Sequence, residues 1–106
     1  MTLLSEREDH SAVYDTANNR MVVFGGWAQT KELVQKYFND VWVLNNANGL
    51  AASAWEHMEP SGTEPIEREL HTAVYDAVRN RMVLYGGATE GSLLNDIWIL
   101  INANGI

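Results

Sequence analysis

The sequence contains no cysteine and only seven basic residues among its 106. The absence of cysteine excludes disulfide bonds and thiolate metal sites. Because 14 acidic residues give a net charge of −7, a nucleic-acid duplex or an anionic membrane is disfavoured as a partner. No apolar run approaches the roughly 20 residues that a membrane-spanning helix requires. With 46% hydrophobic and 20% charged residues, the composition is that of a folded globular chain.

The motifs of common enzyme chemistries are also absent. The sequence has no HxH or HExxH for a metal, no GxGxxG or Gly-Lys-Ser/Thr for a nucleotide, and no nucleophile elbow. Its first residues, MTLLSERED, lack the basic start and apolar core of a secretory signal, so we expect a cytoplasmic protein. We therefore predict no catalytic residue, no metal ligand and no cofactor.

What the sequence does contain is an internal repeat. Residues 6–26 read EREDHSAVYDTANNRMVVFGG, and residues 67–87 read ERELHTAVYDAVRNRMVLYGG, at an offset of 61. A second block, NDVWVLNNANG from Asn39, recurs as NDIWILINANG from Asn95 at an offset of 56. The first copy therefore carries five additional residues between its two blocks, within the stretch 27–38.

Each copy consists of short apolar and β-branched segments separated by turns, which is an all-β pattern. In the first copy we predict strands at 10–15, 19–26 and 40–46 and around 54–60. The turn between the first two begins with aspartate and ends with asparagine, a residue that tolerates left-handed backbone. The second copy repeats only the first three strands before the sequence ends, so we count four strands and then three.

Two strands of the first copy are apolar at successive positions, 21–24 and 41–44. Successive side chains of a strand point to opposite faces, so a sheet with one wet face would alternate instead. Both faces of these strands are therefore predicted to be covered. A sheet stacked between two like sheets, as in a β-propeller blade, meets that demand, whereas the competing two-layer sandwich predicts alternation.

Several features recur in both copies and carry a family resemblance. They are the glycine pairs Gly25-Gly26 and Gly86-Gly87, the histidines His10 and His71, each with an arginine upstream, and the ND-x-W strands with Trp42 and Trp98. With these features the chain resembles the kelch-repeat β-propellers. The sequences of its repeated segments are similar to those of bacterial kelch proteins. The resemblance implies two kelch-type four-stranded antiparallel blades, residues 6–60 and 61–106, the second lacking its fourth strand.

The repeated glycines and histidines are predicted to be structural. Glycine allows positive φ and close backbone approach at the end of a strand, which blades converging near a propeller axis would need. We expect His10 and His71 to bond backbone at a blade junction, because residues kept for packing recur in both copies. His57, in the fourth strand, is expected to face solvent.

Two blades are fewer than the five to eight or so that the resemblance implies. A lone pair would expose apolar rows such as Val13, Met21, Val23 and Trp42, or their opposite-face neighbours, and such patches mark interfaces. We therefore predict a partial propeller completed by self-assembly, with three chains forming a six-bladed ring. A homodimer, with or without strand exchange, and a fragment of a larger propeller are the alternatives.

Six residues are predicted to bind a partner. Trp27, Lys31, Lys36 and Tyr37 lie in the longer loop of the first copy, where aromatic anchors and two of the few basic residues would attract an acidic peptide. The same loop could instead pack against a neighbouring blade. Arg7 and Arg68 are flanked by glutamates, with which they either pair or form a ring that holds an anionic ligand.

These observations favour a non-catalytic kelch-type protein-binding or scaffold module that self-assembles into a propeller-like oligomer. Because kelch propellers include enzymes, adhesion proteins and ligase adaptors, the fold alone does not decide the function. The alternatives are an enzyme whose site forms where chains meet, from Arg7, Arg68, His10 and His71 with nearby carboxylates, and a fragment of a larger kelch propeller.

Overall fold

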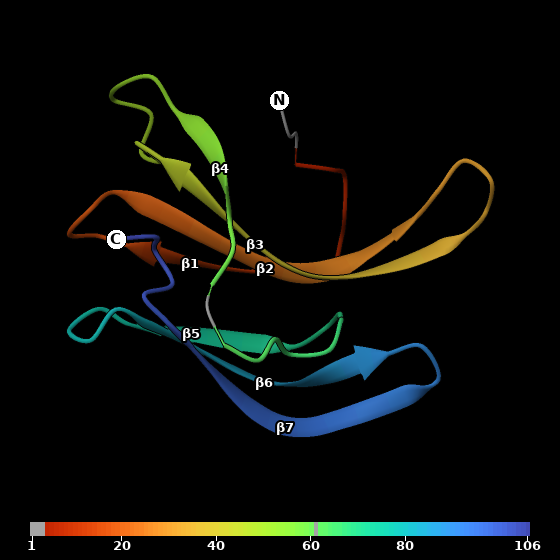
Figure 1. The fold of residues 1–106 in the computed structure, drawn as a ribbon. Coiled ribbons are helices and arrows are strands. Elements are labelled where there is room, and N and C mark those ends of the chain that lie inside the picture. Colours follow the sequence, from red (N-terminus) through yellow and green to blue (C-terminus); the bar gives the residue numbers. More distant parts are fainter. Residues whose placement is uncertain (1–3, 61) are drawn as a thin grey trace.

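The computed structural model describes residues 4–60 and 62–106, and its strands form two antiparallel sheets (Figure 1). Residue 61, the predicted start of the second copy, lies outside the described residues. The first sheet has the order β1 (Ser11–Asp15), β2 (Arg20–Gln29), β3 (Gln35–Asn45), β4 (Ala54–Met58). The second has the order β5 (Thr72–Asp76), β6 (Arg81–Thr89), β7 (Ser92–Ile101). This arrangement confirms the predicted all-β fold with four strands followed by three. Within the described ranges no helix is long and apolar enough to span a membrane.

The first turn of each sheet follows the predicted chemistry. Asp15 Oδ1 accepts the backbone N–H of Ala17 at 3.1 Å and of Asn18 at 3.3 Å, and Asn19 closes the turn with φ of 54°. Asp76 Oδ1 and Asn80 play the same roles in the second sheet, where Asn80 has φ of 53°. The aspartate therefore fixes the start of each turn, and asparagine takes the left-handed position.

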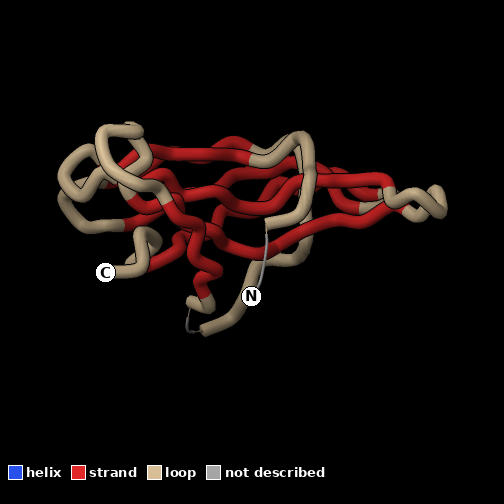
Figure 2. The backbone as a smooth tube through the Cα atoms, turned by 90° about the horizontal axis from the view of Figure 1, so that it is seen from above, coloured by secondary structure: helices blue, strands red, loops and turns tan. Residues whose placement is uncertain are grey.

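The segment predicted as a loop at 27–38 is mostly strand. β2 continues to Gln29 and β3 begins at Gln35, with Trp27 paired opposite Tyr37. Only residues 30–34 turn, where the Thr30 backbone N–H donates to the Val34 carbonyl at 2.8 Å. The five additional residues of the first copy thus lengthen a hairpin that projects from the stacked sheets (Figures 1 and 2).

The two sheets stack face to face, with β1 beside β5 (Figure 1). Between them lies the apolar core, formed by Val22, Phe24, Val41 and Val43 of the first sheet and Met82, Leu84, Leu100 and Ala103 of the second copy. Each fully buried aliphatic or aromatic side chain of this kind stabilises a fold by roughly 1.5–3 kcal/mol. The contact between the sheets therefore supplies the main apolar core of the described residues.

The first sheet is partly buried on its other face, where Tyr14 remains 44% exposed. There Val23 and Trp42 are only 4% and 3% exposed, and the His57 ring stacks on the Trp42 ring at 4.8 Å. The prediction that β2 and β3 are covered on both faces therefore holds at Val23 and Trp42, whereas Met21 and Leu44 are only half-buried on this face. The expected exposure of Val23 and Trp42 is wrong, because their in-sheet neighbours and the His57 ring on β4 cover them.

The second sheet keeps one apolar face open. Along β7 the side chains alternate, and Ile97, Ile99 and Ile101 are 67%, 51% and 58% exposed. Tyr85 of β6 and Val74 of β5 share this face and are also more than half exposed. The predicted covering of both faces thus fails here, since no part of the described chain packs on this side.

The second glycine of each pair makes a close approach that no side chain would allow. Gly26 and Gly87 have φ of 114° and 96°. A Cβ on Gly26 would lie 2.8 Å from the Glu8 carbonyl oxygen, and one on Gly87 would lie 2.5 Å from that of Glu69. Positive φ and close approach are confirmed, but the neighbour is the segment that precedes the first strand of each sheet.

Candidate interaction surfaces

Each arginine upstream of a first strand clamps the aspartate at the start of the third. The Arg7 guanidinium donates to both carboxylate oxygens of Asp40, at 2.5 and 3.0 Å, and to the Gly25 carbonyl at 3.2 Å. Arg68 does the same with Asp96, at 2.7 and 2.9 Å, and with the Gly86 carbonyl. The expected pairing with neighbouring glutamates is wrong, because both arginines form bidentate pairs with the aspartates that the sheet brings beside them.

The two arginine–aspartate clamps stabilise the fold, because the guanidinium groups are buried and the carboxylates are held in the charged form. Arg68 is fully buried, and the Arg7 side chain is 4% exposed. Arg68 holds the pKa of Asp96 well below its usual range. Burial raises the pKa of Asp40, but the hydrogen bonds from Arg7 and from an indole N–H outweigh it and lower that pKa. The anion-binding role for Arg7 and Arg68 stays a prediction, and both guanidinium groups are already occupied.

A buried histidine joins the two sheets. His71 Nε2 lies 2.6 Å from Ser11 Oγ, and its ring meets the Phe24 ring edge-on at 5.4 Å. Burial, reinforced by the nearby Arg68 and His10, lowers the pKa of His71 to about 4. The junction position predicted for His71 is confirmed, and Nε2 finds the Ser11 hydroxyl there.

His10 occupies the repeat-equivalent position in the first copy, lies near His71 and is exposed. The four residues of the enzyme alternative are therefore split between two clamps, a buried junction and the surface. Among the residues that the structure describes, no group of three or more histidine or acidic side chains is arranged to hold a metal ion.

A second polar junction connects the end of the second copy to the first turn. Asn104 Nδ2 donates to Asp15 Oδ2 at 2.6 Å, and Arg20 Nη1 donates to the Asn104 carbonyl at 2.7 Å. Burial raises the pKa of Asp15, but the hydrogen bonds from Asn104 and from the turn outweigh it and lower that pKa. The two copies are thus fixed relative to each other by polar contacts as well as by the apolar core.

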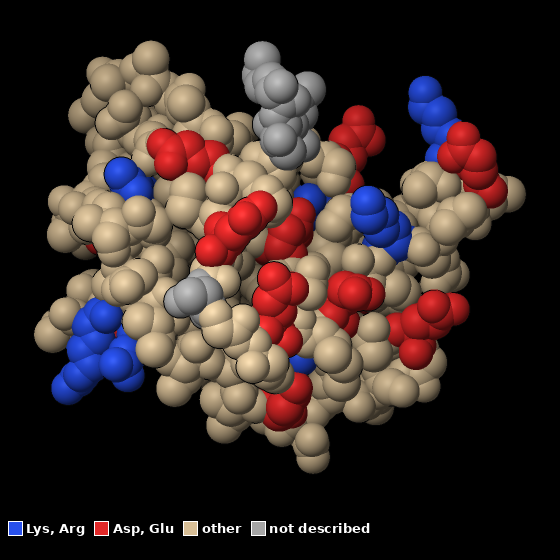
Figure 3. Space-filling view, viewed as in Figure 1, with Lys and Arg blue, Asp and Glu red and all other residues tan. Residues whose placement is uncertain are grey.

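Four of the six predicted binding residues line one groove at the base of the projecting hairpin. Arg7, Trp27, Lys31 and Lys36 border a cavity of about 710 Å3 together with the N-terminal segment. Phe38 forms part of its wall, with the Arg7 guanidinium 3.9 Å and Lys36 Nζ 5.3 Å from its ring centre. Figure 3 shows positive and negative side chains side by side on this hairpin.

Tyr37 and Arg68 lie outside that groove. Tyr37 alternates with Lys36 and Phe38 along β3 and so lies on the opposite face of the hairpin. Desolvation, followed by the charges of Glu69 and Glu90, raises the pKa of Tyr37. Arg68 lies in the second clamp, away from the hairpin. The hairpin therefore offers two different sides: a cationic one with Lys36, and an aromatic one with Tyr37.

The residue types of the second sheet did not by themselves predict that one of its faces is open. The repeat alignment carried the signal, because three of the open positions have a buried equivalent in the first sheet. Tyr85 corresponds to Phe24, which is fully buried, and Ile99 corresponds to Val43, which is also fully buried. The same residue pattern is therefore buried in one sheet and exposed in the other.

Stacked antiparallel sheets, each with a terminal glycine pair and an arginine–aspartate clamp, are blades of a β-propeller. A family model described as the KLHDC2/KLHL20/DRC7 Kelch-repeats domain matches residues 1–104. The chain belongs to the kelch-repeat family, which confirms the resemblance seen in the sequence.

Curated relatives support the assignment. The chain is 38% identical over 101 residues to Host cell factor homolog hcf-1 of Caenorhabditis elegans, covering 89% of this chain and 12% of that protein. It is 33% identical over 95 residues to human Host cell factor 1, covering 82% of this chain and 5% of that protein.

A third relative is Dynein regulatory complex subunit 7 of Chlamydomonas reinhardtii, 40% identical over 87 residues, covering 80% of this chain and 6% of that protein. The chain thus spans 12% or less of the length of these three relatives. All three are eukaryotic, so the likeness to bacterial kelch proteins stays a prediction.

Proposed function

We propose that the chain is a non-catalytic protein-binding or scaffold module that assembles head to tail into a propeller-like oligomer, with three chains supplying six blades. The observation that carries the proposal is the open apolar face of the second sheet. Its residues Ile97 and Ile99 correspond to Val41 and Val43, which are buried by a neighbouring blade within the chain.

The complementary half of this contact lies on the outer side of the first sheet. Tyr14 and Met21 point there, and their equivalents Tyr75 and Met82 pack into the core between the sheets. One chain therefore presents both halves of the same contact on opposite sides. A contact of this kind is heterologous, and it closes into a ring when the rotation between blades allows it.

The alternative is that the open face receives a further blade of the same polypeptide. The small share of each relative that the chain covers favours this version. One relative is named as a subunit of a regulatory complex, which is compatible with a scaffold role for kelch blades. Both versions bury the open face, and they differ in whether separate chains are required.

The cationic side of the hairpin is proposed to contact an acidic peptide of a partner. Lys31 and Lys36 are exposed beside the Trp27 groove in a chain of net charge −7. A hexaglutamate peptide is expected to bind the wild type and to lose binding in a Lys31→Glu/Lys36→Glu variant. Equal binding to both would contradict this contact.

Sedimentation velocity tests the assembly. The wild type is expected to sediment at three times the mass of one chain, while Ile99→Lys is expected to sediment as a folded monomer because a charge cannot be buried unpaired. Val78→Lys is the matched control, since Val78 is 90% exposed in the β5–β6 turn and away from the face. A wild type that stays monomeric with a native circular dichroism spectrum, or an Ile99→Lys trimer, would overturn the proposal.

A further inference from the structure

The sequence contains two Asn-Gly pairs at equivalent positions of the repeat, Asn48–Gly49 in the turn after β3 and Asn104–Gly105 in the turn after β7. Each pair follows an alanine. Asparagine before glycine is the arrangement most prone to deamidation, because glycine has no side chain to hinder attack of its backbone nitrogen on the asparagine side chain. The two turns thus hold the same reactive pair in the same local sequence.

Both turns orient the reacting groups in the same way. The Gly49 N–H donates to the Asn46 carbonyl at 3.1 Å, and the Gly105 N–H donates to the Asn102 carbonyl at 3.0 Å. Each asparagine Oδ1 accepts one hydrogen bond from the backbone N–H two residues on, and one from the asparagine that closes the first turn of its sheet. Two such donors stabilise the oxyanion that forms when the neighbouring nitrogen attacks Cγ. The attacking groups and the oxyanion donors therefore do not distinguish the two sites.

The leaving amide nitrogen does distinguish them. Asn104 is only 2% exposed, and its Nδ2 donates to Asp15 Oδ2 at 2.6 Å. Asn48 is exposed, and within the described residues its amide nitrogen has no hydrogen-bond partner. Ammonia can therefore leave directly into solvent from Asn48, whereas its departure from Asn104 requires a buried hydrogen bond to break first.

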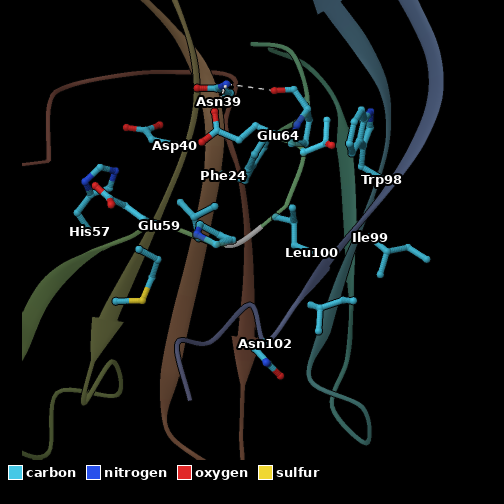
Figure 4. Close-up of a pocket in the computed structure, with 16 residues that line it drawn as sticks. Phe24, Asn39, Asp40, His57, Glu59, Glu64, Trp98, Ile99, Leu100 and Asn102 are labelled. Carbon is cyan, nitrogen blue, oxygen red and sulfur yellow. Dashed lines mark hydrogen bonds between the residues drawn. The ribbon is translucent and has the colours of Figure 1, made fainter.

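The surroundings of the two glycines differ in the same direction. A Cβ on Gly49 would have no atom of the described chain within 4 Å beyond its immediate neighbours, whereas one on Gly105 would lie 2.5 Å from Met58 Sδ. The turn after β7 begins at Asn102, which lines the pocket between the first copy and β7 (Figure 4). Water and hydroxide thus reach the turn after β3 freely, while the first copy packs against the turn after β7.

We propose that Asn48 is a deamidation site of the folded chain and that the junction between the copies protects Asn104. The Gly49 backbone nitrogen attacks Cγ of Asn48 and loses its proton to water or hydroxide, so a nitrogen–carbon bond forms. The Cγ–Nδ2 bond breaks, and the amide leaves as ammonia after taking a proton from water. Water then opens the cyclic succinimide at either carbonyl, which leaves aspartate or isoaspartate at position 48 and one further negative charge.

The modification alters a contact between two turns. Asn19 Oδ1 accepts the backbone N–H of Asn48 at 3.0 Å, and Asn19 Nδ2 donates to the Asn48 side chain at 3.0 Å. An aspartate keeps an acceptor for Asn19, but an isoaspartate adds a methylene to the main chain at this point. The isoaspartate product therefore loosens the turn that leads to β4.

The test is peptide mapping by mass spectrometry after incubation in mildly alkaline buffer. Trypsin places the two sites in separate fragments, because it cuts after Lys36, Arg68 and Arg81, and fragment ions locate the change. In the folded protein Asn48 is expected to convert about tenfold or more faster than Asn104, which reacts only from locally opened molecules. In concentrated urea the two should convert at similar rates, and Asn48→Gln should remove the modified fragment without affecting Asn104.

A pair of aspartate variants tests the protection of Asn104. Asp15→Ala removes the acceptor of the Asn104 amide and should raise conversion at Asn104 toward that at Asn48. Asp76→Ala, at the equivalent turn of the second sheet, is the matched control and should leave Asn104 protected. Unchanged conversion of Asn104 in Asp15→Ala would contradict the protective role of this contact.

The wild type and the Ile99→Lys variant are mapped in parallel, because only the wild type is expected to assemble. Equal conversion of the two asparagines in the folded Ile99→Lys variant, or faster conversion of Asn104, would overturn the proposal. Faster conversion of Asn48 in both proteins supports it. Protection of Asn48 in the wild type alone also supports it for the single chain, and would show in addition that assembly covers the turn after β3.

Discussion

The two sheets of this protein are built from similar sequences, but they differ in how far equivalent residues are buried and in whether the third strand has a partner on both edges. In the first, Phe24 and Val43 are fully buried and a fourth strand closes the edge of β3. In the second, the equivalent Tyr85 and Ile99 are 53% and 51% exposed. Their environments differ because the first sheet has a neighbouring sheet on that side and the second, within the described residues, has none.

The difference teaches that burial in a repeat protein belongs to the contact between neighbours. Each blade carries an apolar face on both sides, and its stability is the sum of its own pairing and of the interfaces it forms. The local devices, in contrast, are the same in both sheets: the glycine pair, the arginine clamp and the aspartate turn.

The largest expected difference between the two sheets concerns alanine substitutions at the equivalent residues Phe24 and Tyr85. Phe24→Ala should cost about 4 kcal/mol of unfolding free energy, because it leaves a cavity between the sheets. Tyr85→Ala should cost well under 1 kcal/mol in the monomer, since that ring is half in solvent. Urea unfolding at low protein concentration measures both, and equal losses would show that the two faces are not distinguished.

The two clamps provide the next test. Arg68→Ala should lower the unfolding free energy by about 2 kcal/mol, because it removes hydrogen bonds from a fully buried guanidinium, while the 40% exposed Asp96 that it leaves behind stays partly hydrated. Arg7→Ala should cost less, since Arg7 lowers the pKa of Asp40 less than Arg68 lowers that of Asp96. The measurement is again urea unfolding, with Arg79→Ala at a surface pair as the control. A larger loss for Arg7→Ala would reverse the expected order.

The junction histidine makes stability depend on pH. The unfolded chain binds a proton on His71 at about pH 6.5, but burial lowers the pKa in the folded state to about 4. Stability is therefore complete above about pH 6.5 and falls as the pH drops toward 4, by up to about 3 kcal/mol. His71→Gln should flatten thermal stability across this window and His10→Gln should not; a slope that survives in His71→Gln would contradict the assignment.

The smallest effect concerns the two turn aspartates. Asp15→Ala should cost about 1.5 kcal/mol, because it also leaves the buried Asn104 amide without its acceptor. Asp76→Ala removes the same turn bonds at a less buried position and should cost measurably less. Chemical denaturation of the two variants side by side decides the point, and identical losses would mean that the Asn104 contact is not a stabilising junction.

Much of this fold was predictable from the repeat. The alignment of 6–26 with 67–87 gave the strand count, the turn residues and the glycine positions, because each depends on local backbone chemistry. The apolar runs also predicted stacking of like sheets, since no single-faced sheet would use them. What a run cannot show is which of its two faces has a neighbour, so the open face appeared only in the structure.

The candidate site was harder to predict. The pairing of Arg7 with Asp40 depends on two strands meeting across the sheet, and the adjacent glutamates offered a nearer but wrong partner. The stretch 27–38 looked like a loop because of its extra length, yet its alternating side chains continue the β2–β3 pairing. Trp27, Lys31 and Lys36 do line one groove, and their binding role stays a prediction. Tyr37 was grouped with them although successive strand residues face opposite ways.

The most direct test of head-to-tail assembly uses the lack of cysteine in the chain, so that introduced thiols are unique. Tyr14→Cys marks the outer side of the first sheet, and Val74→Cys marks the open face of the second. When the two single variants are mixed with a short bismaleimide, cross-links should join 14 to 74, and the double variant should give a ladder that stops at three chains. Cross-links joining 74 to 74, or none at all, would contradict head-to-tail stacking of the blades.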